Sequence, residues 1–131
     1  LDEGDIEQLL QIETLSTLKA YPSHLFNDKL FNEVRSSWTS GSLIHLGLGF
    51  HWEALIKCNW LEQFPHLTRL ELYTDAIDFS QLDSTKMEGV TEIFITHINS
   101  RNLSEMDILV LRSQSNRFMN RSGIQVYLSF L

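Results

Sequence analysis

A repeated apolar frame, Leu-x-x-Leu-x-Leu, is the sequence feature that most limits how this chain can fold. Its clearest copy spans residues 67–73, with looser copies at 43–48 and 90–95 and a degenerate one at 15–20. The residues at the fourth position of successive copies are 28, 24 and 23 residues apart; they are Leu18, Leu46, Leu70 and Ile93. These intervals lie in the range of leucine-rich repeats, in which each unit contributes one strand and a returning segment.

Each copy of the frame predicts a short strand whose fourth and sixth residues point to one face, while their neighbours point to the other. We expect the first face to form the core and the second, the open strand face, to contact solvent or a partner. The intervals leave room for one helix between strands. Because such a unit cannot bury its own apolar face, the copies predict an α/β fold, a leucine-rich-repeat-like curved solenoid with helices on the outer face.

Apolar residues at helical spacing predict further elements between the strands. Helices are expected over residues 5–12 and 52–63, with a helical turn near 79–83. Another helix is expected to begin at Asn27 as its N-cap, with an inner face formed by Leu30, Phe31, Val34 and Trp38.

The last third of the chain predicts one more helix and one more strand. Ser104 followed by Asp107 indicates a capping box, so we expect a helix to about residue 115. Residues 106–111 also fit the strand frame, but the cap favours the helix. Alternating apolar residues over 123–130 predict a fifth strand. The pattern therefore predicts about five strands in a single domain, residues 1–131.

Composition is that of a folded domain without a membrane span. The hydrophobic fraction of 43% and the charged fraction of 21% are ordinary globular values. The sequence contains no apolar run long enough to cross a bilayer and no secretion signal. A single cysteine, Cys58, excludes an intrachain disulfide and predicts a cytoplasmic or nuclear location. The chain starts at Leu1 without methionine and stops among apolar residues, so we expect a fragment of a longer protein.

The charge of the chain is negative and uneven. A net charge of −7 disfavours general nucleic-acid binding, which depends on neutralising phosphates with Lys and Arg. Five acidic residues and no basic one lie in the first thirteen positions, whereas the last third carries Arg101, Arg112, Arg117 and Arg121. We interpret both ends as solvated faces rather than docking sites; RNA binding through these arginines is a lesser alternative.

Little in the sequence indicates catalysis or a cofactor. The five histidines lack metal-site spacing and the only cysteine has no partner, so no metal is expected. Glu71 and Glu92 fall on neighbouring strands with Arg69 near both, which could form the carboxylate pair of a small hydrolase, but a cross-strand salt bridge is favoured. Gly47 and Gly49 lie on the open strand face. We favour a flattened strand, or a bulge where a neighbouring backbone comes close, over room for a ligand.

From about residue 52 onward, three runs of the chain resemble the FTH domain, a module found in a large nematode family of F-box proteins. Residues 60–72 are similar to that family's Leu-Glu-Gln-Trp helix end and following strand. Residues 93–98 and 103–112 are similar to its strand followed by a Ser-x-x-Asp-Ile-Leu-x-Leu-Arg helix. Asn116-Arg117-Phe118 with residues 124–128 resembles its closing Asn-Phe and strand.

The chain departs from the family pattern in three places: Phe64 stands where the family tends to have Trp, Met87-Glu88-Gly89 replaces a His-Phe pair, and the closing cysteine is absent.

The resemblance implies the substrate-recognition domain of a cullin-type F-box ubiquitin ligase. In such proteins a separate F-box, not visible in this sequence, binds the Skp-type adaptor. This chain alone is therefore expected to bind the target and not the ligase. Residues 1–50 share only the repeat frame with the family.

We therefore expect a protein–protein interaction domain that is not an enzyme, needs no cofactor and binds a protein target with its open strand face. The alternatives are a generic leucine-rich-repeat scaffold unrelated to ubiquitin and, less favoured, a small hydrolase or an RNA-binding module. Tyr73 and Phe94 are the favoured contacts, although cross-strand packing would explain them equally. The full set of candidate contacts is His45, Arg69, Glu71, Tyr73, Glu92, Phe94 and Thr96.

Overall fold

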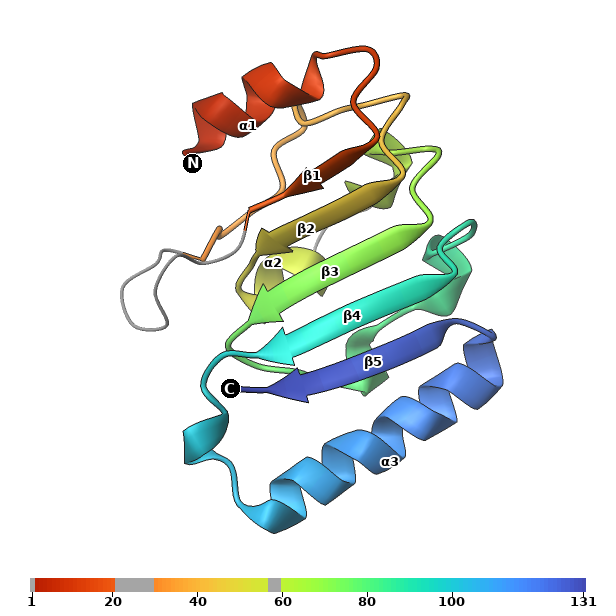
Figure 1. Cartoon of the computed structure of the whole chain (residues 1–131). Helices are drawn as coiled ribbons and strands as arrows, with labels where there is room; N and C mark the ends of the chain where they lie inside the picture. Colours follow the sequence, from red (N-terminus) through yellow and green to blue (C-terminus); the bar gives the residue numbers. More distant parts are fainter. Residues whose placement is uncertain (1, 21–29, 57–59) are drawn as a thin grey trace.

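A parallel five-stranded sheet forms the centre of the protein (Figure 1). The computed structural model describes residues 2–20, 30–56 and 60–131. The strands lie side by side in chain order, β1 to β5, and the sheet is not closed. Their bounds are β1 Thr17–Lys19, β2 His45–Gly49, β3 Arg69–Thr74, β4 Glu92–His97 and β5 Gln125–Phe130. The mixed α/β class and the five predicted strands are confirmed.

The repeat frame sets the register of the sheet. Leu18 pairs with Leu46, Leu46 with Leu70, and Leu70 with Ile93. Val126 of β5 continues this row beside Ile93. These five residues are all buried, which confirms that the fourth position of the frame points into the core.

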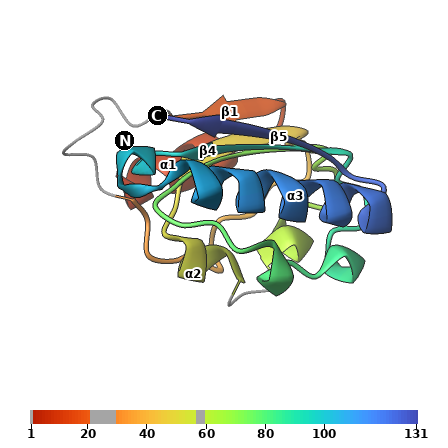
Figure 2. The same ribbon diagram turned by 90° about the horizontal axis from the view of Figure 1, so that it is seen from below.

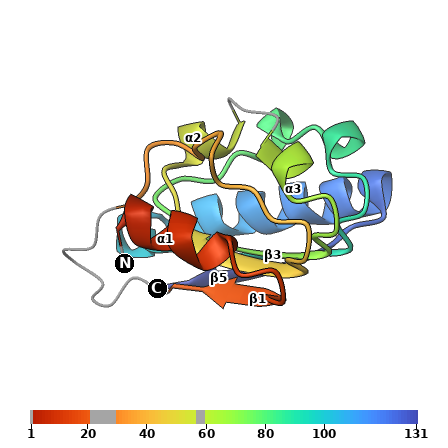
Figure 3. The ribbon, with the colours of Figure 1, turned by 90° about the horizontal axis from the view of Figure 1, so that it is seen from above.

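The helical segments cover one face of the sheet and lie along its two edges. In Figures 2 and 3, α2 and the short 3-10 turns lie on a single side of the strands, whereas α1 flanks β1 and α3 flanks β5. In the described part of the chain, no helix is long and apolar enough to span a bilayer. The bounds are α1 Glu3–Leu10, α2 Trp52–Ile56, α3 Glu105–Ser122, and the 3-10 turns η1 Trp60–Gln63, η2 Phe79–Gln81, η3 Ser84–Lys86 and η4 Ser100–Asn102.

Helix α3 begins where the sequence predicted and extends further. The Ser104 side chain accepts a hydrogen bond from the Asp107 amide at 3.1 Å, and the Asp107 carboxylate accepts one from the Ser104 amide at 3.0 Å. The predicted capping box is confirmed and the strand alternative for 106–111 is wrong. The helix runs to Ser122 because the next residue able to end it is Gly123, which adopts a left-handed conformation with φ of 76°.

The helix predicted to start at Asn27 is wrong for the residues that the structure describes. Asn27 itself lies outside them, and residues 30–40 are irregular. The Phe31 amide donates to the Gly49 carbonyl at 2.9 Å, and the Phe31 carbonyl accepts from the His51 amide at 3.1 Å. Because these bonds extend the edge of β2, the backbone of Phe31 cannot also take part in a helix. The apolar spacing reflected burial rather than helical periodicity.

The other predicted helices are partly confirmed. The first helix, predicted over 5–12, forms as α1 and begins earlier because Asp2 caps it in a box with Asp5. The helix predicted over 52–63 appears as α2 and η1, and residues 57–59 between them lie outside the described residues. The turn predicted near 79–83 is η2.

The core lies between the sheet and the helical segments. Phe50 packs against Trp38 and Trp60 with ring centroids 6.5 and 6.4 Å apart. At the other end, Phe118 of α3 packs against Phe79 of η2 at 5.8 Å. Ring packing therefore joins the segments around Trp38 and Trp60 to the end of β2, and joins η2 to α3.

Two leucines on α3 provide a matched test of this packing. Leu111 faces the core and is 9% exposed, whereas Leu109 is 60% exposed. We expect Leu111→Ala to lower the free energy of unfolding by about 2–3 kcal/mol, because it removes buried methyl groups and leaves a cavity. Leu109→Ala should cost less than about 0.5 kcal/mol. Urea unfolding followed by circular dichroism measures both, and equal losses would contradict the placement of α3.

Candidate functional site

The sheet face that the helices leave bare is the candidate site, and we call it the open face. Side chains alternate along each strand, so the residues between the buried leucines and isoleucines point to this face. Every candidate contact predicted from the sequence lies on it. Its residues are Thr17, Lys19, His45, Gly47, Gly49, Arg69, Glu71, Tyr73, Glu92, Phe94, Thr96, Gln125, Tyr127 and Ser129.

Strand register arranges these side chains in three rows across the sheet. The first row runs through Thr17, His45, Arg69, Glu92 and Gln125. The second runs through Lys19, Gly47, Glu71, Phe94 and Tyr127. The third runs through Gly49, Tyr73, Thr96 and Ser129. Side chains that are neighbours within one row, or diagonal neighbours in adjacent rows, are close enough to interact.

Glu71 is the polar centre of the open face. One of its oxygens, Oε1, lies 2.8 Å from His45 Nε2 and 3.1 Å from Lys19 Nζ. The other, Oε2, accepts a hydrogen bond from the Tyr73 hydroxyl at 3.4 Å. The side chains of Glu71 and His45 are only 13% and 12% exposed. The carboxylate is therefore held in place by groups from β1, from β2 and from its own strand, β3.

Gly47 makes the contact between Lys19 and Glu71 possible. These two residues sit on β1 and β3, and Gly47 lies between them on β2. A Cβ atom on Gly47 would lie 3.1 Å from Glu71 Cβ and 3.4 Å from Lys19 Cγ. The glycine thus leaves space for two long side chains to meet over the backbone of β2. The sequence predicted that a neighbouring backbone comes close to Gly47, whereas the atoms nearest to it belong to the side chains of Glu71 and Lys19.

The two carboxylates considered for a hydrolase do not share a cation. Arg69 Nε donates to Glu92 Oε1 at 2.9 Å, between residues directly opposite on β3 and β4. Glu71 instead engages Lys19 and His45, and its register partner on β4 is Phe94. The pairing of Arg69 with Glu92 is the cross-strand salt bridge favoured from the sequence.

Aromatic rings occupy the β4–β5 side of the open face. The rings of Phe94 and Tyr127 stack with centroids 4.7 Å apart and an angle of 15° between their planes. Tyr127 is 47% exposed, so its ring is available to a partner. The sequence analysis did not select Tyr127, although the alternation over residues 123–130 would have placed it on this face. Thr96 lies in the next row, between Tyr73 and Ser129.

A second polar group lies where the strands end, beside α2. His51 Nδ1 and Asp75 Oδ2 are 2.9 Å apart, and the Trp52 amide donates to Asp75 Oδ1 at 3.4 Å. Burial raises the pKa of the Asp75 carboxyl, but the hydrogen bonds with His51 and backbone amides outweigh it, so the pKa lies below its ordinary value. Asp75 therefore fastens the start of α2 to the end of β3. The sequence analysis identified none of these residues.

His97 ends β4 on the buried side of the sheet. It is 4% exposed, its Nδ1 accepts a hydrogen bond from the Asn99 amide at 3.2 Å, and its ring stacks on Phe130. Burial lowers the pKa of the imidazole, and the attraction of Asp75 opposes this only in part. The neutral form of His97 is thus the one that fits the fold.

Neither metal ligation nor a known relative adds to this description. Within residues 2–20, 30–56 and 60–131, no group of three or more His, Cys, Asp or Glu is arranged to hold a metal ion. No protein-family model, curated protein or solved structure matches the chain. What the open face can do must therefore be argued from its geometry and chemistry.

Substituting Gly47 should separate the pair that it accommodates. We expect Gly47→Val to lower the free energy of unfolding by about 1–3 kcal/mol, because its side chain meets Glu71 and Lys19. Gly41→Ala is the control, since a Cβ there has nothing within 4 Å. Thermal unfolding measures both variants. An unchanged or raised melting temperature for Gly47→Val would contradict the packing described for this row.

The buried imidazole of His97 should make stability depend on pH. Because its pKa is lower in the folded state, its contribution is fully present above the unfolded value of 6.5 and is lost as the pH falls through the folded value. We expect His97→Asn to reduce the loss of stability between about pH 7.5 and 5.5. The exposed His66, replaced in the same way, should leave that slope unchanged. Urea titrations at each pH provide the test, and equal slopes in all three proteins would contradict it.

Proposed function

We propose that this domain is a protein-binding module that recognises its target with the open face. The observation that carries the proposal is a parallel sheet with one face bare, on which an exposed aromatic stack lies beside fixed charges. Parallel sheets are usually covered on both faces. We therefore expect an uncovered face that bears rings and charges to bind a partner.

We further propose that the domain belongs to the leucine-rich-repeat type of solenoid. Three features support this architecture. The strands are parallel and follow chain order, the repeat frame places Leu18, Leu46, Leu70 and Ile93 in one row, and the short helical segments between β2 and β4 lie on one face. A solenoid uses its strand face as an extended binding surface, which agrees with the place of the candidate contacts.

The two halves of the open face favour different contacts. Towards β1, the carboxylate of Glu71 is held among cationic and hydroxyl groups, so this half favours hydrogen bonds and charge pairing. Towards β5, the stacked rings of Phe94 and Tyr127 offer rigid apolar surface. Rings and arginines are typical anchors of interfaces, and Arg69, with its side chain 54% exposed, lies at the boundary between the halves.

The resemblance to the FTH module suggests the biological role of this binding. On that basis we propose substrate recognition for a cullin-type F-box ubiquitin ligase, with the Skp-type adaptor bound by a segment outside these residues. A binding role unrelated to ubiquitin would use the same face. The separate pairing of Glu71 and Glu92 gives the hydrolase alternative no support.

Substitutions of the rings test the binding role. We expect Phe94→Ser and Tyr73→Ala each to weaken capture of a protein target by about tenfold or more, because they remove central aromatic contacts. Met106→Ser is the control: this residue is 66% exposed but lies on α3, away from the open face. Quantitative affinity capture, followed by the dissociation constant of the recovered target, makes the comparison.

Folding must be shown for each variant by circular dichroism and melting temperature. Unchanged binding of both ring variants to every recovered protein would refute the proposal.

A further inference from the structure

A row of exposed apolar side chains runs along the first half of α3, and the open face does not account for it. Three of the seven large apolar side chains that are exposed among the described residues lie within five positions of this helix; they are Met106, Leu109 and Val110. Their spacing of three and four residues places them on one side of the helix. Leu111 and Phe118 are buried on the other side, so this set, the α3 row, is directed to solvent.

The helices at the two edges of the sheet differ in what they present to solvent. Helix α1, beside β1, buries Ile6 and Leu10 and exposes Asp5 and Gln8. Figure 2 shows α3 beside β5, on the same side of the strands as α2. The β1 edge therefore ends in a polar helix, whereas the β5 edge ends in one with an apolar outer row. Exposed apolar side chains that adjoin one another mark a contact surface.

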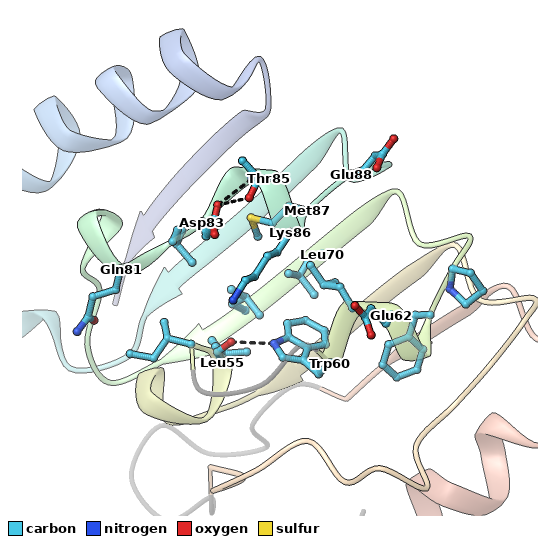
Figure 4. A pocket seen from close by; sticks show the side chains of 16 residues that line it. Leu55, Trp60, Glu62, Leu70, Gln81, Asp83, Thr85, Lys86, Met87 and Glu88 are labelled. Atoms are coloured by element: carbon cyan, nitrogen blue, oxygen red, sulfur yellow. Dashed lines mark hydrogen bonds between the residues drawn. The ribbon is translucent and has the colours of Figure 1, made fainter.

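The cavity on the helical side of the sheet offers no comparable surface (Figure 4). It has a volume of about 570 Å³, and Leu55, Trp60 and Met87 line it but are buried. Its lining also includes three carboxylates and one ammonium group, from Glu62, Asp83, Glu88 and Lys86. A protein surface laid over this region would reach few apolar atoms, whereas the α3 row is accessible along its whole length.

Charges beside the α3 row indicate what it contacts. Glu105 and Arg112 are exposed and seven residues apart, which is close to two helical turns, so they lie on the same flank of the row. The Arg112 guanidinium lies 5.4 Å from the centroid of the Phe130 ring, which holds it on the flank towards β5. When two such helices pair antiparallel about a twofold axis, Glu105 of each faces Arg112 of the other. The flank is therefore complementary in charge to itself.

We propose that two copies of this chain pair through α3. The helices lie antiparallel, the two α3 rows pack on each other, and Glu105 of each copy forms an ion pair with Arg112 of the other. A contact of α3 with α1 of a second copy fits less well, because it would cover the apolar row with the polar side of α1. Pairing through α3 leaves both open faces uncovered, so it does not depend on what the open face binds.

Sedimentation equilibrium of the whole chain, from micromolar concentration to the solubility limit, tests the apolar part of the contact. We expect a dimer with a dissociation constant on the order of 10–100 μM, because the contact is smaller than a standard interface. The chain is then monomeric at the low micromolar concentrations of the unfolding and binding measurements. Leu109→Ser should weaken the dimer at least about tenfold, since the buried leucine is lost from both copies. Ile44→Ser, which removes an exposed apolar side chain ahead of β2, should leave it unchanged.

Charge reversal tests the antiparallel arrangement. Glu105→Arg and Arg112→Glu should each weaken the dimer, because like charges then face each other across the twofold axis. An equal mixture of the two variants should associate at least as tightly as the unchanged chain, since every facing pair again has opposite signs. Circular dichroism and the melting temperature establish that each variant is folded, and recovery in the mixture shows that neither variant has lost the contact by misfolding.

Four results would overturn the proposal. They are a chain that stays monomeric up to its solubility limit, equal effects of Leu109→Ser and Ile44→Ser, a mixture of the charge-reversal variants that does not associate, and assemblies larger than a dimer. The last result would identify a different contact, because a twofold contact closes at two copies.

Discussion

The register of the parallel strands is the constraint on which the rest of the structure depends. Side chains alternate along a strand, so a slip of one residue would exchange the core face for the open face. The row of Leu18, Leu46, Leu70, Ile93 and Val126 prevents this slip, because each of these residues is buried only when all of them align. The same alignment sets every row of the open face, including the one that brings Lys19 and Glu71 together over Gly47.

Much of this arrangement could be predicted from the sequence, because the spacing of the repeat frame determines the register of the strands. All five strands, the capping box of Ser104 and the face of each candidate contact followed from short-range patterns. The segment after β1 could not be predicted in this way. Spacing shows that Val34 and Trp38 are buried, but a helix and an irregular chain bonded to the end of β2 bury them equally well.

The sequence placed the candidate residues on one face of the sheet and indicated the pairing of Arg69 with Glu92, but not the other contacts of the open face. For Glu71 a cross-strand salt bridge with Arg69 was favoured over a catalytic pair with Glu92, whereas the structure joins it to Lys19 and His45, contacts that depend on the register of three strands. Tyr127 was missed for the same reason: its importance depends on the ring of Phe94 on the neighbouring strand. Contacts within a row require the register of two or more strands, which no single frame contains.

Strand β3 connects the core to the open face. Its alternate residues point to opposite sides, with Leu70 and Leu72 in the core and Glu71 and Tyr73 on the open face. Because β3 is hydrogen-bonded to strands on both sides, its backbone is among the least able to move. A partner on the open face therefore meets a preformed surface, and ordering the strand adds little to the cost of binding.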